Sequence, residues 1–144
     1  MHEEKSTTDL FNSIKGIKPN NEMADFINTN STNISFSSYI NQYIYDNNLN
    51  LKDVVSASML ESHYAYQIIN GIRKNPGRNK VLALCIGASM NLSHIQRGLK
   101  ISGNAILYPK NSRDIIIITH INNKIFNIGI INEALESYDE ELIY

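Results

Sequence analysis

The side chains best suited to contacting a ligand are polar residues that recur on one face of a predicted helix, residues 62–70. They occupy positions i, i+1, i+4, i+5 and i+8 and are Ser62, His63, Tyr66, Gln67 and Asn70. Residues three and four apart lie on the same face of a helix, so these side chains should point outward together. The glutamine and asparagine amides each carry a donor and an acceptor, a pair that matches the edge of adenine in the DNA major groove.

Basic residues follow this polar face directly and are Arg73, Lys74, Arg78 and Lys80. They are placed where phosphates flank a groove and would supply affinity that does not depend on base sequence. The chain of 144 residues has a net charge of −1, which hides an uneven distribution. Residues 35–110 hold eight basic and three acidic side chains, whereas residues 1–34 sum to −2 and residues 111–144 to −4. This pattern points weakly to a polyanionic partner, and ordinary surface variation is the alternative.

Two short helices joined by a tight turn are expected to hold this polar face. The first, residues 50–58, has Asn50 as its cap, and the second, residues 62–70, is ended by Gly71. Apolar side chains that would clamp the pair together are Val54, Val55, Leu60, Ala65 and Ile68. Further amphipathic helices are predicted over residues 37–47, over residues 78–88, and from a Ser93 cap to Gly103. Two short helices within such a bundle define a helix-turn-helix architecture.

The flanking segments are also expected to be helical. A helix over residues 7–15 would be capped by Thr7 or Thr8, a second would start at the cap Asn20, and residues 28–33 would form a loop. Beyond residue 104, Asn111 or Ser112 would cap one helix and Asn127 another. The four isoleucines at 115–118 favour a strand on propensity, but the cap and the first-turn Asp114 favour a helix. The fold class is therefore predicted to be all-α, without a sheet.

Several short motifs, in this order and spacing, resemble one known family. They are Asn-Leu-Lys-Asp-Val-Val at 50–55, Ala-Tyr-Gln-Ile at 65–68, Asn-Gly-Ile-Arg at 70–73, Pro76, and Leu-Ala-Leu at 82–84. Over residues 37–103 the chain resembles the Cro/repressor-type (lambda repressor-like) helix-turn-helix domain. The motifs at 96–100 and 107–109 resemble a subgroup of bacterial one-domain regulators with a helical tail. The resemblance implies a five-helix DNA-binding bundle, commonly dimeric, that regulates transcription.

On this basis the chain divides into an N-terminal helical extension with a linker (1–34), a helix-turn-helix DNA-binding domain (35–103) and a C-terminal helical extension (104–144). Three positions differ from the family pattern. Leu51 replaces a phosphate-gripping Gln, Met59 replaces a turn Gly, and Glu61 replaces a Ser or Thr cap. Glutamate is expected to be a poor cap and to repel DNA, and a non-glycine residue with positive φ costs about 1 kcal/mol. These differences favour an alternative, a helix-turn-helix fold that serves protein contacts, as in an antitoxin or a phage-type inhibitor.

Composition excludes several other classes of function. The single cysteine, Cys85, cannot form an intramolecular disulfide or a multi-cysteine zinc site. The histidines are scattered and the glycines dispersed, so neither a metal site nor a glycine-rich phosphate loop is expected. We therefore predict no enzyme and no cofactor. No run approaches about 18 apolar residues and the first residues are acidic, so we expect a cytoplasmic protein with no contact to a membrane.

Partners and residue roles follow from this interpretation. We expect Tyr66 and Gln67 to read bases in double-stranded DNA, while Arg73, Lys74 and Arg78 hold phosphates. A homodimer built by the tail would place a second recognition helix one helical turn of DNA away, about 34–36 Å. The aliphatic surface available for it is Ile115, Ile118, Ile121, Ile130, Ile131 and Leu135. The competing account is that this surface packs back on the rest of the protein and gives a monomer.

Overall fold

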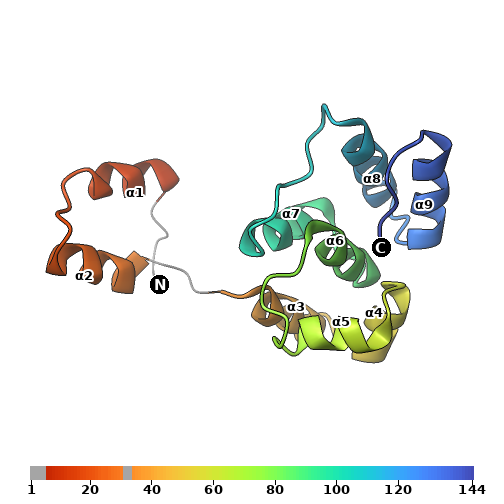
Figure 1. The fold of residues 1–144 in the computed structure, drawn as a ribbon, viewed down its shortest axis with the longest axis horizontal. Helices are drawn as coiled ribbons and strands as arrows, with labels where there is room; N and C mark the ends of the chain where they lie inside the picture. Colours follow the sequence, from red (N-terminus) through yellow and green to blue (C-terminus); the bar gives the residue numbers. More distant parts are fainter. Residues whose placement is uncertain (1–5, 31–33) are drawn as a thin grey trace. The chain divides into compact units, whose positions relative to one another are not determined.

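A computed structural model describes residues 6–30 and 34–144 of the chain. Within these residues there are nine helices and no strand (Figure 1). The all-α prediction is therefore confirmed for the described residues, including the segment 115–118, which lies inside a helix. The chain forms two compact units, residues 1–33 and residues 34–144, and each is described here by itself.

The first unit begins with α1 (Thr7–Ile14). Its cap is Ser6, whose hydroxyl accepts a hydrogen bond from the backbone N–H of Asp9 at 3.2 Å. The prediction of Thr7 or Thr8 as the cap is wrong, because both threonines already lie within the helix. Ser6 lies three residues before Asp9, which is the usual spacing between a cap and the backbone N–H that donates to it.

The second helix of this unit is α2 (Asn21–Asn30). As predicted, Asn20 caps it, since its side-chain oxygen accepts from the N–H of Glu22 at 2.8 Å. The loop predicted from residue 28 is wrong at its start, because the helix continues to residue 30. Residues 31–33 lie outside the described part of the chain.

Five helices form the body of the second unit: α3 (Phe36–Asp46), α4 (Leu51–Ala57), α5 (Ser62–Ile69), α6 (Arg78–Gly87) and α7 (Leu92–Ile101). Helix α6 is central, because its residues 81–86 are all buried and it packs against both α4 and α7. Helix α3 packs against α5 and α7, which closes the bundle around α6.

The start of α7 differs from the prediction. Asn91 is the cap, with its side-chain oxygen accepting from the N–H of His94 at 2.9 Å, whereas Ser93 is an exposed residue of the first turn. Asn91 lies two residues before the predicted Ser93, and asparagine and serine are comparable caps.

The tail consists of α8 (Ser112–Asn122) and α9 (Ile128–Ser137), which lie side by side (Figure 1). Asn111 and Asn127 are their caps, each accepting from the N–H three residues on, as predicted. Helix α8 packs against α7, and α9 packs against α6. The buried side chains of the tail belong to the same hydrophobic cluster as those of the five-helix body, so residues 104–144 are part of one compact unit with it.

A charged pair fastens the tail to the body. The two terminal nitrogens of Arg78 donate to the two carboxylate oxygens of Asp114 at 3.0 and 2.9 Å, in bidentate geometry. Asp114 is buried, with 4% of its surface exposed, and also accepts from the N–H of Tyr108 at 2.9 Å. The first residue of α6 and the first turn of α8 are thereby held together.

Candidate nucleic-acid interface

The connection between α4 and α5 is a four-residue turn, residues 58–61. The buried Ser58 hydroxyl donates to the carbonyl of Val55 at 2.6 Å and accepts from the N–H of Leu60 at 3.3 Å. Met59 has a φ of 58°, in the left-handed region that glycine usually occupies. The turn is therefore closed by a methionine in a conformation that costs on the order of 1 kcal/mol.

Glu61 caps α5 through its carboxylate. One oxygen accepts from the N–H of Tyr64 at 2.8 Å and the other from the N–H of His63 at 2.9 Å. These hydrogen bonds, first that of Tyr64 and then that of His63, lower the pKa of the Glu61 carboxyl. The expectation that glutamate is a poor cap is wrong here, because its longer side chain reaches two backbone donors at once. Since the folded pKa is lowered, the cap stabilises the protein above the ordinary carboxyl pKa and is lost as pH falls through the lowered value.

The other end of α5 is fixed to α3. The Ser37 hydroxyl and the Asn41 amide both donate to the carbonyl of Ile69, at 2.6 and 2.8 Å. Gly71, with a φ of 83°, ends the helix as predicted. The helix is therefore fastened at both ends, with one face buried in the core: Ala65, Ile68 and Ile69.

The opposite side of α5 carries the side chains predicted to contact bases. Ser62, His63 and Asn70 are exposed, and Gln67 is half-buried. Tyr66 is also half-buried and packs against the hydrophobic core, so only part of it faces outward. The structure thus leaves four polar side chains and the edge of one tyrosine on this side of the helix.

Side chains on and beside this face are linked to one another. The Arg73 Nε–H donates to the Gln67 amide oxygen at 2.8 Å, and the Gln67 amide nitrogen lies 3.1 Å from Nε2 of His63. The Arg73 guanidinium carbon lies 4.1 Å from the centre of the Tyr64 ring, and Lys80 Nζ lies 5.4 Å from the same ring. Cations within about 6 Å of an aromatic centroid are attracted to the ring. We call these five residues, His63, Tyr64, Gln67, Arg73 and Lys80, the α5 cluster.

Tyr64 was not among the residues selected from sequence. Its half-buried ring packs against the core and holds two cations beside α5. Aromatic residues followed by basic residues are common in sequences, so this pattern alone does not predict the contact between the Tyr64 ring and the two cations. The contact itself depends on how the chain turns between α5 and α6.

The remaining two predicted phosphate ligands differ from each other. Lys74 is exposed and makes no hydrogen bond or ion pair within the part of the chain that the structure describes. Arg78 makes four hydrogen bonds, two to Asp114 and one each to the carbonyls of Ala105 and Ile106. Since Arg78 uses its donors to hold the tail, we leave it out of the candidate interface.

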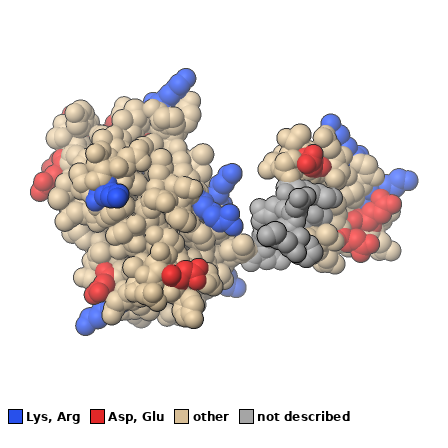
Figure 2. Space-filling model, turned by 180° about the vertical axis from the view of Figure 1, so that it is seen from behind, with Lys and Arg blue, Asp and Glu red and all other residues tan. Residues whose placement is uncertain are grey.

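The charged side chains do not form one broad basic patch on the face drawn in Figure 2. On that face of the second unit, lysine and arginine side chains lie in separate groups, with acidic side chains between them. On this face, basic side chains come close together only in small groups.

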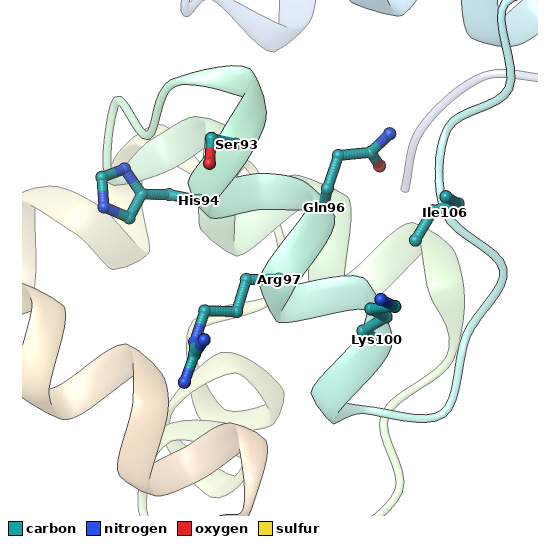
Figure 3. A pocket seen from close by; sticks show the side chains of 6 residues that line it. All are labelled: Ser93, His94, Gln96, Arg97, Lys100 and Ile106. Atoms are coloured by element: carbon teal, nitrogen blue, oxygen red, sulfur yellow. The ribbon is translucent and has the colours of Figure 1, made fainter. Parts of the chain in front are cut away.

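A hollow of about 410 Å³ lies along α7 and is lined by Ser93, His94, Gln96, Arg97, Lys100 and Ile106 (Figure 3). Arg97 and Lys100 make no ion pair within the described ranges, and the lining includes no carboxylate. The labelled side chains splay apart along α7 and the segment that carries Ile106, and they do not converge on one point (Figure 3). The Gln96 amide is used internally, in two hydrogen bonds to the backbone of Leu107. The hollow therefore lacks the converging donors of a ligand site.

Other site chemistries find little support in the described residues. No group of three or more His, Cys, Asp or Glu side chains is placed there to hold a metal ion. Cys85 is buried in α6, and burial raises its pKa, which disfavours the reactive thiolate. Among the helices described, none is long and apolar enough to cross a membrane.

Comparison of the chain with models of known protein families gives no match, and comparisons with curated proteins and with solved structures give none either. The functional assignment therefore rests on the geometry of α4, α5 and the α5 cluster.

Proposed function

We propose that this protein is a cytoplasmic, sequence-specific transcriptional regulator of the Cro/repressor-type helix-turn-helix class, which inserts α5 into the major groove of double-stranded DNA. The observation that carries the proposal is the placement of α5. The helix is fastened by the Glu61 cap and by α3, its apolar face is buried, and its polar face is directed outward. The major groove of B-DNA admits an α-helix of this kind.

The α5 side chains divide into two roles. Gln67, Ser62 and Asn70 carry the donors and acceptors that base edges require, and Gln67 retains one amide N–H and one oxygen lone pair after its internal bonds. Arg73 and Lys80 lie beside this face, the exposed Lys74 follows Arg73 in the chain, and all three would contact phosphates. Phosphate contacts fix the position of the helix, and base contacts give the sequence preference.

A second candidate function is a protein-binding module built on the same fold. Two apolar side chains flank α5: Met59 before it is 64% exposed, and Ile72 after it is 67% exposed. The carboxylate of Glu61 stands at the start of the same helix, where it would repel a phosphate. These features suit a surface that binds another protein. Whether the protein binds duplex DNA therefore distinguishes the two candidate functions.

A homodimer remains part of the proposal, because one recognition helix spans only one half-site. The surface expected to build it is smaller than the sequence indicated. Ile121, Ile131 and Leu135 are buried in the core of the second unit. Ile118 is half-buried and packs against the same core. Of the six predicted side chains, Ile115 and Ile130 stay exposed, at 44% and 47%, and could contact a second copy.

The proposal is tested by selecting duplexes from a random-sequence library and measuring the affinity of variants for the selected site. Gln67→Ala should weaken binding to that site by about 1–3 kcal/mol and leave binding to a scrambled duplex nearly unchanged, because it removes a base contact. Gln42→Ala is the matched control, since Gln42 is an exposed α3 residue whose amide bonds to Asp46. Equal weakening on both duplexes by Gln67→Ala would show that this residue does not read bases.

A further inference from the structure

The hydrogen bonds around Gln67 admit one orientation of its amide. Arg73 Nε carries a hydrogen and has no lone pair, so the Gln67 atom that it meets at 2.8 Å must be the amide oxygen. The amide nitrogen then faces Nε2 of His63 at 3.1 Å. The orientation follows from the chemistry of Arg73 alone, since an amide nitrogen opposite a guanidinium N–H would place two donors together.

This orientation determines the state of His63. The amide nitrogen of Gln67 can only donate, so Nε2 of His63 must accept, and its imidazole must be neutral with the proton on Nδ1. A protonated imidazole carries a hydrogen on both nitrogens, which would set two donors against each other. Turning the Gln67 amide by 180° does not remove this clash, because its amide nitrogen would then face the Arg73 Nε–H, again a donor against a donor.

We infer that Arg73 is a positioning residue that orients the Gln67 amide, and that base reading by α5 therefore requires a neutral His63. The inference rests on the proposed function and adds how the Gln67 amide is oriented for its base contact. With the amide held, one N–H and one oxygen lone pair of Gln67 remain, the pair that adenine recognition uses. Protonation of His63 removes one of the two hydrogen bonds that hold the amide, so the amide is less firmly oriented and its preference among bases is weakened.

Charged and aromatic groups surround this chain of hydrogen bonds. Glu61, at the start of α5, interacts electrostatically with both His63 and Arg73. Arg73 and, from α6, Lys80 lie against the Tyr64 ring. The Tyr64 ring under the guanidinium keeps Arg73 beside Gln67, because a stacked guanidinium loses fewer orientations on forming its hydrogen bond.

The inference changes what is expected of Arg73. If Arg73 only contacted a phosphate, replacing it would weaken binding to every DNA sequence alike. As the residue that orients Gln67, it should also reduce discrimination between sequences. Lys74 is the matched cation, since it follows Arg73 in the chain and makes no hydrogen bond to Gln67 among the described residues.

The first test uses the full chain without DNA. Nitrogen-15 NMR should show the Gln67 side-chain amide moving in step with the His63 imidazole between about pH 5 and pH 8, where histidines change charge. The Gln42 amide, which donates to Asp46 at 2.7 Å, is an internal control and should not move with it. In His63→Gln the Gln67 amide should become independent of pH. A Gln67 amide that does not respond to pH in the unmodified protein would overturn the inference.

The second test measures discrimination, the ratio of affinities for the selected and scrambled duplexes, at about pH 8 and pH 5.5. Discrimination by the unmodified protein should fall about tenfold at the lower pH, the effect of one lost hydrogen bond. His63→Gln should keep it, Arg73→Ala should lose it at both pH values, and Lys74→Ala should weaken both duplexes equally. Unchanged discrimination in Arg73→Ala would overturn the inference. If no duplex binds, the proposed function and the base-reading role both fail, while the NMR titration still decides whether the Gln67 amide is linked to His63.

Discussion

Replacing Asp114 with alanine should lower the free energy of unfolding by about 3 kcal/mol or more. The Asp114 carboxylate is 4% exposed and accepts from both terminal nitrogens of Arg78 and from the N–H of Tyr108. Its removal leaves the Arg78 guanidinium, only 25% exposed, without a counter-charge. The loss is large because an unpaired charge remains in a site from which water is mostly excluded.

Urea denaturation followed by far-UV circular dichroism measures this change. Asp46→Ala is the control, since Asp46 is an exposed residue that pairs only with the Gln42 amide among the interactions described, and it should change stability by less than about 0.5 kcal/mol. Replacing both partners, as Arg78→Met with Asp114→Leu, should recover part of the loss because no charge is left unpaired. A stability of Asp114→Ala close to that of the unmodified protein would mean that the pair does not hold the tail.

Gly87→Ala should destabilise the second unit by about 1–3 kcal/mol, the range observed for overpacked cores. A Cβ at residue 87 would lie 2.8 Å from the carbonyl oxygen of Val54 and 2.9 Å from the backbone nitrogen of Ser58. Both are backbone atoms of α4 and the turn that follows it, so the clash can be relieved only by moving α4 away from α6.

The same substitution at Gly77 is the matched control. Gly77 is the cap of the same helix, its φ of −69° suits any residue, and a Cβ there would meet nothing within 4 Å. Gly77→Ala should change stability by less than about 1 kcal/mol, since alanine restricts the unfolded chain but is a poorer cap than glycine. Thermal unfolding of the two variants side by side measures the difference, and equal melting temperatures would exclude a close approach of α4 to Gly87.

Local sequence signals predicted the helices well. Asn50, Asn111 and Asn127 cap the helices that follow them, because a side-chain oxygen three residues before a backbone N–H is a short-range feature. The segment 115–118 is helical despite its strand propensity, since the cap precedes it and Ile117 packs in the core. Errors arose where a neighbouring residue has a comparable capping propensity, as at Ser6, which precedes the predicted Thr7.

The candidate site was predictable only in part. Helical periodicity placed the polar residues on one side of α5, because it needs no knowledge of the rest of the fold. The capture of Arg78 by Asp114, 36 residues away, could not be read from the local pattern. The same holds for the cations on Tyr64 and for the burial of Ile131 and Leu135, which depend on how α6, α8 and α9 pack.

The salt dependence of binding to a random-sequence DNA duplex, followed by fluorescence anisotropy of the full chain, tests DNA binding through α5 most directly. We expect binding at low salt, with log K falling linearly against log salt with a slope of about −3 per protomer for Arg73, Lys74 and Lys80. Lys74→Ala should reduce the magnitude of the slope by about one, and Lys124→Ala, a control in the exposed turn between α8 and α9, should not change it. Absence of binding at low salt, or a slope unaffected by Lys74→Ala but reduced by Lys124→Ala, would refute DNA binding through this face.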